Sequence, residues 1–208
     1  MTFFKIAHRI NTSEQWAGQP QEYGAEIDVR YHENSLVLHH DPFSHHQDPK
    51  PERLAHFLEH YNGQGPLILN VKTEGIERQC CDLMQKFQIE NWFFLDLSMP
   101  YFVRYSLLAK AGDIPGFSPE NLAVRFSEYE PIEYALSFKG AAAWVWVDCF
   151  TKLPLNESTY SSLKQAGFKI CIVSPELQDH SINLISSFKT QLQPFLIDAV
   201  CTKRPDLW

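Results

Sequence analysis

Ionisable side chains stand within short apolar segments in the first third of the chain. Glu26 and Asp28 are two residues apart in the apolar run 25–29, and a β-strand would place both carboxylates on one face. Two carboxylates at close range repel one another unless a cation neutralises them, and oxygen ligands suit Mg²⁺ and Ca²⁺. We therefore predict a site for one divalent cation, Mg²⁺ or Ca²⁺. The alternative is an acidic face in contact with solvent.

Histidines end two further apolar segments. His8 and Arg9 follow the first segment, and His39 and His40 follow another. Adjacent residues of an extended chain point in opposite directions, so at most one of His39 and His40 can face the site. Histidine titrates near neutral pH and can give or take a proton, although a lone histidine is more often a core or surface residue.

Basic and amide groups complete the candidate site. In the run 67–74, alternation places Asn70, Lys72 and Glu74 on one face. Positive charge from Arg9 and Lys72 near the carboxylates forms either salt bridges or a phosphate clamp. Later segments end in polar residues that either contact substrate or cap the next helix, with Arg125 the best second contact for an anion: Asp96, Arg125, Glu128, Asp148 and Glu176.

A regular alternation of strands and helices has to position these side chains. Apolar, β-rich segments alternate with helix-like stretches from end to end, which is typical of a parallel sheet covered by helices. The predicted strands are 3–7, 25–29, 35–39, 66–71, 92–97, 122–126, 144–147, 168–173 and 195–201, and the predicted helices are 51–61, 76–87, 100–111, 131–138, 156–166 and 181–192.

The strand count favours a closed barrel over a doubly wound sheet. With 25–39 taken as one bent strand or hairpin there are about eight strands, and no glycine-rich phosphate loop follows the first strand. We predict an α/β fold, a compact (β/α)8 TIM barrel, as a single domain over residues 1–208. Such barrels have a lower limit of roughly 200 residues. The first helix, within 13–24, is therefore expected to be shortened or missing, and 41–51 to form a loop over the barrel mouth.

Composition excludes several classes of protein. The net charge of −7, with the 25 acidic residues scattered, argues against nucleic-acid binding, which needs clustered Lys and Arg. No segment reaches the ~18 uninterrupted apolar residues of a transmembrane helix, and the N-terminus lacks the apolar core of a signal peptide. The five cysteines show no zinc-ligand spacing, so we expect reduced, mostly buried thiols in a cytoplasmic protein. The oligomeric state is not predicted.

Four motifs carry a resemblance to a known family. They read IAHR at 6–9 followed by NT at 11–12, YGAEIDV at 23–29, LVLHHDP at 36–42, and IDAVCTKRPD at 197–206. In order and spacing this set is similar to the glycerophosphodiester phosphodiesterase family. The motifs bracket the chain, whereas the middle matches only in its rhythm of strands and helices.

The resemblance implies a metal-dependent phosphodiesterase barrel acting on a small glycerophosphodiester-like substrate. It implies that His8 and His40 are the general acid and base, that Glu26 and Asp28 bind the cation, and that Arg9 contacts the phosphate. The chain departs from the family pattern at Ile10, Asn70 and Lys203, where the family usually has Gly, Glu and Asp. Asn70, or Glu74 on the same face, would then complete the cation site, with Lys72 and Arg125 as further substrate contacts. The alternatives are a noncatalytic barrel that binds a phosphoryl ligand and a lyase that forms a cyclic phosphate.

Overall fold

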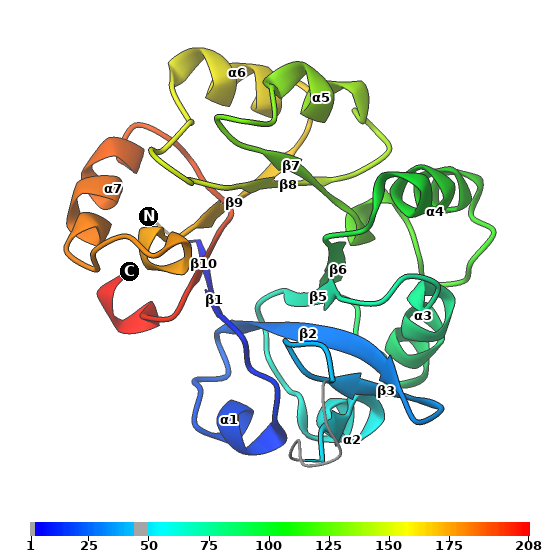
Figure 1. Ribbon diagram of the computed structural model, residues 1–208. Helices are drawn as coiled ribbons and strands as arrows, with labels where there is room; N and C mark the ends of the chain where they lie inside the picture. The colour runs from blue at the N-terminus through cyan, green and yellow to red at the C-terminus, as the bar shows by residue number, and fades with distance from the viewer. Residues whose placement is uncertain (1–2, 44–49) are drawn as a thin grey trace.

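The computed structural model describes residues 3–43 and 50–208. Within them, eight strands run parallel around a central axis, and the helices surround them (Figure 1). The strands are β1 (Phe4–Ala7), β2 (Gly24–His32), β5 (Leu67–Val71), β6 (Trp92–Leu95), β7 (Ala123–Phe126), β8 (Trp144–Val147), β9 (Lys169–Val173) and β10 (Ala199–Thr202). The predicted TIM-barrel architecture is confirmed.

The first and last strands join the two halves of the barrel. β1 pairs with β10 on one side and β2 on the other, with Ala7 opposite Thr202 and Ala25. The pairing continues through β5 to β6 in one direction and through β9 and β8 to β7 in the other. Between β6 and β7 the described strands share a single bridge, Phe94 to Leu122. The ring is therefore joined by ladders at seven junctions and by one bridge at the eighth.

Seven α-helices are described, and α1 is short, as predicted. They are α1 (Ser13–Ala17), α2 (Leu54–His60), α3 (Glu77–Lys86), α4 (Met99–Ala111), α5 (Ile132–Ser137), α6 (Glu157–Gln165) and α7 (Leu184–Leu192). Thr12 and Gln15 form a capping box at the start of α1, and Trp16 anchors the helix against Tyr61 with ring centroids 4.7 Å apart. One buried aromatic ring thus holds a helix too short to be stable by itself.

A hairpin extends from the barrel beside β2. β3 (Ser35–Leu38) pairs antiparallel with β2 through the turn residues Glu33 and Asn34, which have φ of 46° and 60°. These are the left-handed angles of a tight hairpin turn. The two-residue strand β4 (Glu52–Arg53) adds to β3. The predicted loop 41–51 includes residues 44–49, which lie outside the described part of the chain.

Apolar side chains fill both the barrel interior and the layer beneath the helices. Inside the barrel, Phe93 and Trp144 stack with centroids 4.8 Å apart. All five cysteines are buried free thiols, as predicted. None of the helices in the described residues combines the length and apolarity that a membrane-spanning helix needs.

Candidate active site

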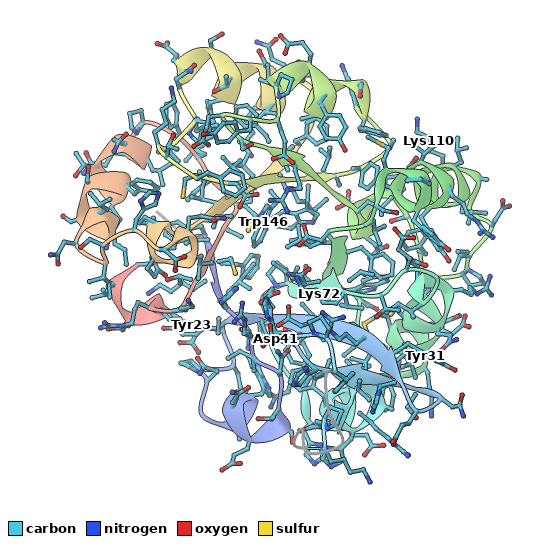
Figure 2. The ribbon with its side chains drawn as sticks, viewed as in Figure 1. Tyr23, Tyr31, Asp41, Lys72, Lys110 and Trp146 are labelled. Carbon is cyan, nitrogen blue, oxygen red and sulfur yellow. The ribbon has the colours of Figure 1, made fainter. Side chains whose placement is uncertain are left out.

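Polar side chains converge at the end of the barrel where the parallel strands finish. His8 and Arg9 follow β1, Asp28 lies on β2, and Asp96 and Asp148 follow β6 and β8. In Figure 2 the labelled side chains of Lys72, Trp146 and Asp41 lie around the centre of the barrel, whereas Tyr31 and Lys110 lie at its outside. This is the end at which TIM-barrel enzymes carry their active sites.

Two buried carboxylates of β2 form the base of the site. Glu26 and Asp28 are each only 1% exposed. Glu26 Oε2 accepts a hydrogen bond of 2.8 Å from the backbone N–H of Arg9, and its Oε1 accepts one of 2.9 Å from Asn70 Nδ2. Asp28 Oδ2 accepts one of 2.8 Å from Asn11 Nδ2. The strand alternation predicted from the sequence is therefore present, with both carboxylates on the inner face.

Burial disfavours the charged form of Glu26. It raises the pKa of Glu26 to about 7, and the negative charge of Asp28 acts in the same direction. Hydrogen bonds from Asn70 and Arg9 partly oppose the shift. A bound cation would stabilise the ionised form of both groups.

Unpartnered buried atoms mark the space between these groups. Asp28 Oδ1, Asn70 Oδ1 and His8 Nδ1 are buried and have no hydrogen-bond partner. These two oxygens lie beside the Glu26 carboxylate and suit a hard divalent cation, which prefers oxygen ligands, although Lys72 Nζ also lies 3.5 Å from Asp28 Oδ1. Among the described residues no group of three or more His, Cys, Asp or Glu side chains could hold a metal, and Asn70 Oδ1 is the amide oxygen that could act as a third ligand beside Glu26 and Asp28. Glu26, Asp28 and Asn70 fit the predicted cation.

The two predicted catalytic histidines line one cavity of about 150 Å³. His8 Nε2 lies 3.6 Å from Glu26 Oε2, and burial lowers the pKa of His8 to about 4, with the charges of Arg9 and Lys203 adding to the effect. His40 is 37% exposed, and its Nδ1 lies 2.7 Å from Asp41 Oδ1. His8 is thus a neutral, half-buried imidazole, and His40 is a more exposed one oriented by a carboxylate.

Two non-glycine residues in the left-handed region stand at strand ends in this site. Arg9 has φ 57° and Asp96 has φ 61°. Such backbone costs on the order of 1 kcal/mol or more and persists where its surroundings hold it. For Arg9 the holding contact is its N–H bond to Glu26, and its side chain, 44% exposed, reaches to 3.8 Å from Asp28 Oδ2.

The opposite wall of the cavity is acidic and contains Arg125. This guanidinium pairs with Asp96 and Asp148, and its Nε donates to Glu130 Oε1 at 3.1 Å. Arg125, predicted as a contact for the substrate anion, does line the cavity, and there its charge is shared among these three carboxylates. Lys72 lies between the two walls, 3.5 Å from Asp28 Oδ1 and 3.7 Å from Asp96 Oδ2.

Glu74 is not brought into the site, and Trp146 and Gln178 are among the cavity residues that were not predicted. β5 ends at Val71, so the strand alternation stops before Glu74, which is exposed. Gln178, whose Nε2 donates to Asp148 Oδ1 at 2.9 Å, and Trp146 both line the cavity. Strand alternation could have predicted Trp146, because it lies on β8 two residues before Asp148. Nothing in the sequence marks Gln178, which lies on a short 3-10 turn.

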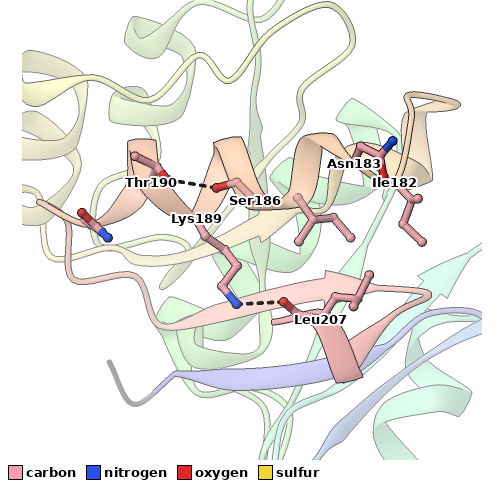
Figure 3. A pocket seen from close by; sticks show the side chains of 8 residues that line it. Ile182, Asn183, Ser186, Lys189, Thr190 and Leu207 are labelled. Atoms are coloured by element: carbon pink, nitrogen blue, oxygen red, sulfur yellow. Dashed lines mark hydrogen bonds between the residues drawn. The ribbon is translucent and has the colours of Figure 1, made fainter.

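Larger hollows lie elsewhere on the molecule and lack this chemistry. One of about 480 Å³ runs between α7 and the C-terminal turn, where Lys189 Nζ donates to the backbone oxygen of Leu207 at 2.8 Å and Thr190 to that of Ser186 at 3.1 Å (Figure 3). Another, of about 710 Å³, includes Tyr23 and Trp144 at the opposite end of the barrel. Neither contains a histidine.

Comparison with known proteins gives matches among solved structures. A crystal structure of a glycerophosphodiester phosphodiesterase from Agrobacterium tumefaciens str. C58 has a TM-score of 0.69 and 15% identity, over 99% of each chain. One of a glycerophosphoryl diester phosphodiesterase from Parabacteroides distasonis ATCC 8503 has a TM-score of 0.67 and 13% identity, over 98% of this chain and 84% of the other. The chain has the fold of the glycerophosphodiester phosphodiesterases.

No family model and no curated protein sequence matches the chain. The likeness to glycerophosphodiester phosphodiesterases outside the four motifs is therefore one of fold. Within the motifs, the residues that carry the sequence resemblance lie together: His8, Arg9, Asp28 and His40 line one cavity, and Glu26 contacts two of them.

Proposed function

We propose that the chain is a divalent-cation-dependent phosphodiesterase that hydrolyses a small glycerophosphodiester-like substrate. The observation that supports this most directly is the meeting of two histidines and a buried carboxylate pair at the C-terminal end of a barrel with the glycerophosphodiester phosphodiesterase fold. A phosphodiester carries a negative charge that repels nucleophiles, so its hydrolysis needs positive charge and proton transfer together.

Glu26, Asp28 and Asn70 would hold the cation, Mg²⁺ or Ca²⁺. When bound, a divalent cation would supply positive charge that offsets the negative charge of the phosphodiester. Arg9 and Lys72 flank the carboxylates and are placed to bind the remaining phosphate oxygen.

The two histidines divide the proton transfers. His8, whose pKa is lowered, is neutral at pH 7 and takes the proton of the attacking water as its oxygen bonds to phosphorus. His40 gives a proton to the leaving alkoxide as the P–O bond to the alcohol breaks. Asp41 Oδ1, 2.7 Å from His40 Nδ1, orients the imidazole from which that proton comes.

Two other functions share this site. A noncatalytic phosphoryl-binding barrel is favoured by the neutral Asn70 beside only two carboxylates, which weakens cation binding. A lyase differs only in that a substrate hydroxyl attacks in place of water, so that a cyclic phosphate forms.

Phosphorus NMR with glycerophosphocholine and Mg²⁺ or Ca²⁺ separates these functions. We expect glycerol phosphate from the native chain, and no turnover from His8→Ala or His40→Ala. His60→Ala, which removes an exposed histidine of α2, serves as the control and should keep full activity. Turnover that survives both site variants would refute the mechanism. A cyclic product identifies the lyase, and calorimetric binding without turnover identifies the noncatalytic barrel.

We also propose a cytoplasmic location and no nucleic-acid partner. The five buried free thiols support a reducing compartment, and the net charge of −7 opposes binding to a polyanion. Fractionation of cells that express the chain tests the location.

A further inference from the structure

Positive charge is unevenly available around the cavity. The guanidinium of Arg125 is engaged by three carboxylates, and Lys72 lies between Asp28 and Asp96. An anionic group placed against this wall would meet Asp96 and Asp148 at short range. Like charges at such distances repel strongly where water is partly excluded.

Lys203 lies at the same end of the barrel as the cavity, across the ring from Arg125 and just outside the residues that line the cavity. It follows β10 directly, and the backbone N–H of His8 donates to the neighbouring Thr202 oxygen at 3.0 Å, which places Lys203 beside the start of the His8–Arg9 segment. Its own backbone N–H donates to Glu176 Oε1 at 3.0 Å, which fixes the base of the side chain. Its charge is among those that act on His8.

The ammonium group of Lys203 is uncommitted. Lys203 is exposed and has no ion-pair partner within residues 3–43 and 50–208, whereas its neighbour Arg204 is paired with Asp206 at 2.6 Å. Arg9, also partly exposed, holds only a long contact of 3.8 Å to Asp28. Lys203 is therefore a cation without an ion-pair partner in the described residues, on the His8 side of the barrel end, whereas Arg125 is paired with acids on the other side.

We propose that Lys203 binds a second anionic group of the substrate, so that the diester cleaved here carries a phosphomonoester or carboxylate on one of its alcohols. The inference rests on the proposed function, because it assumes that the diester phosphate lies at His8 and the carboxylate pair. An additional anionic group is attracted by Lys203 and repelled by Asp96 and Asp148. These charges therefore determine how the substrate is oriented in the cavity as well as how tightly it binds.

Calorimetry with three ligands of one carbon skeleton tests this. Glycerol 3-phosphate, 3-phosphoglycerate and glycerol 1,3-bisphosphate present a hydroxyl, a carboxylate and a phosphate at the same position. At constant ionic strength we expect the native chain to bind the two ligands that carry a second anionic group about fivefold or more tightly than glycerol 3-phosphate. One charge-assisted contact provides a difference of this size. Tighter binding of 3-phosphoglycerate would identify the second group as a carboxylate, and tighter binding of glycerol 1,3-bisphosphate would identify it as a phosphomonoester.

Two lysine variants show where the preference originates. Lys203→Gln should abolish it. Lys152→Gln, which removes an exposed lysine that follows β8 at the same end of the barrel, should leave it unchanged. Equal binding of all three ligands by the native chain, or a preference that survives in Lys203→Gln, overturns the inference and leaves the proposed function standing. No binding of any of the three would refute the phosphoryl site itself, and both proposals with it.

Discussion

Asn11 and Asp28 exchange two hydrogen bonds of 2.8 Å. Asn11 Nδ2 donates to Asp28 Oδ2, and the backbone N–H of Asp28 donates to Asn11 Oδ1. The pair connects the loop after β1 to the middle of β2. A buried carboxylate is in this way fixed in orientation before any ligand arrives, which is the preorganisation that a cation site needs.

Replacing Asn11 by Ala should loosen Asp28 and weaken cation binding. The change leaves a buried carboxylate oxygen and a buried N–H without partners, which costs about 1–3 kcal/mol of the free energy of unfolding. We also expect the dissociation constant for Mg²⁺ to rise about tenfold or more, as for other residues that orient a metal ligand. Urea unfolding and calorimetric titration measure the two effects, with the exposed Asn183→Ala as control. Unchanged values in both experiments would show that Asp28 is held by other contacts.

Glu26 should make the cation-free protein less stable as the pH rises. Its pKa is about 7 in the folded state and near the ordinary value of 4.5 in the unfolded chain, so unfolding releases a proton between these values. The free energy of unfolding of the native chain, relative to Glu26→Gln, should therefore fall from pH 4.5 to pH 7, by about 3 kcal/mol at most. The lowered pKa of His8 makes the protein more stable as the pH rises. Because His8 is present in both proteins, this contribution cancels when the native chain is compared with Glu26→Gln.

The measurement is urea unfolding at several pH values in the presence of a chelator. Adding Mg²⁺ at pH 8 should restore stability to the native chain and much less to Glu26→Gln, because a cation needs the ionised carboxylate. A difference between the two proteins that does not change with pH would contradict the raised pKa.

Asn70→Asp should make folding more dependent on the cation. A third acidic group beside Glu26 and Asp28 adds repulsion and removes the donor to Glu26 Oε1, so the melting temperature without cation should drop by several degrees. With Mg²⁺ the rise in melting temperature should exceed that of the native chain, since a charged ligand replaces a neutral one. Differential scanning calorimetry with and without Mg²⁺ measures both shifts. An identical Mg²⁺ response in the two proteins would place the cation away from Asn70.

Arg125→Met should destabilise the barrel through uncompensated acids. Asp96, Asp148 and Glu130 all lose their shared cation, and breaking such a partly buried network costs roughly 2–3 kcal/mol. Removing one of the acids as well, in Arg125→Met with Asp148→Asn, should recover part of the loss. Urea unfolding of the single and double variants checks the coupling. Additive effects would mean that the charges act independently.

The sequence predicts the barrel well because its strands are buried on both faces and stand out as apolar runs. The predicted start of the last strand is wrong, because buried apolar residues also precede it. Phe195 and Ile197 are buried, but β10 begins only at Ala199. The two-residue strand β4 could not be predicted, since its pairing with β3 depends on tertiary contact.

The site is predictable as far as strand alternation reaches. Alternation correctly places Glu26 and Asp28 together, and it fails for Glu74 because β5 has already ended. The role of Arg125 depends on which strands flank β7 around the ring, and composition and spacing carry no information about that neighbourhood.

The Asp96–Arg125 ion pair also connects β6 to β7. Elsewhere in the described barrel, neighbouring strands are joined by two to five paired residues, but these two share one bridge. Asp96 directly follows β6, and Arg125 lies on β7, so their side chains span the junction. At this junction the ion pair and a buried hydrogen bond of 2.9 Å from Asn121 Nδ2 to the backbone oxygen of Trp92 supplement the single bridge. The barrel is therefore held closed at this junction partly by an ion pair, which lies next to the cavity that a charged substrate would enter.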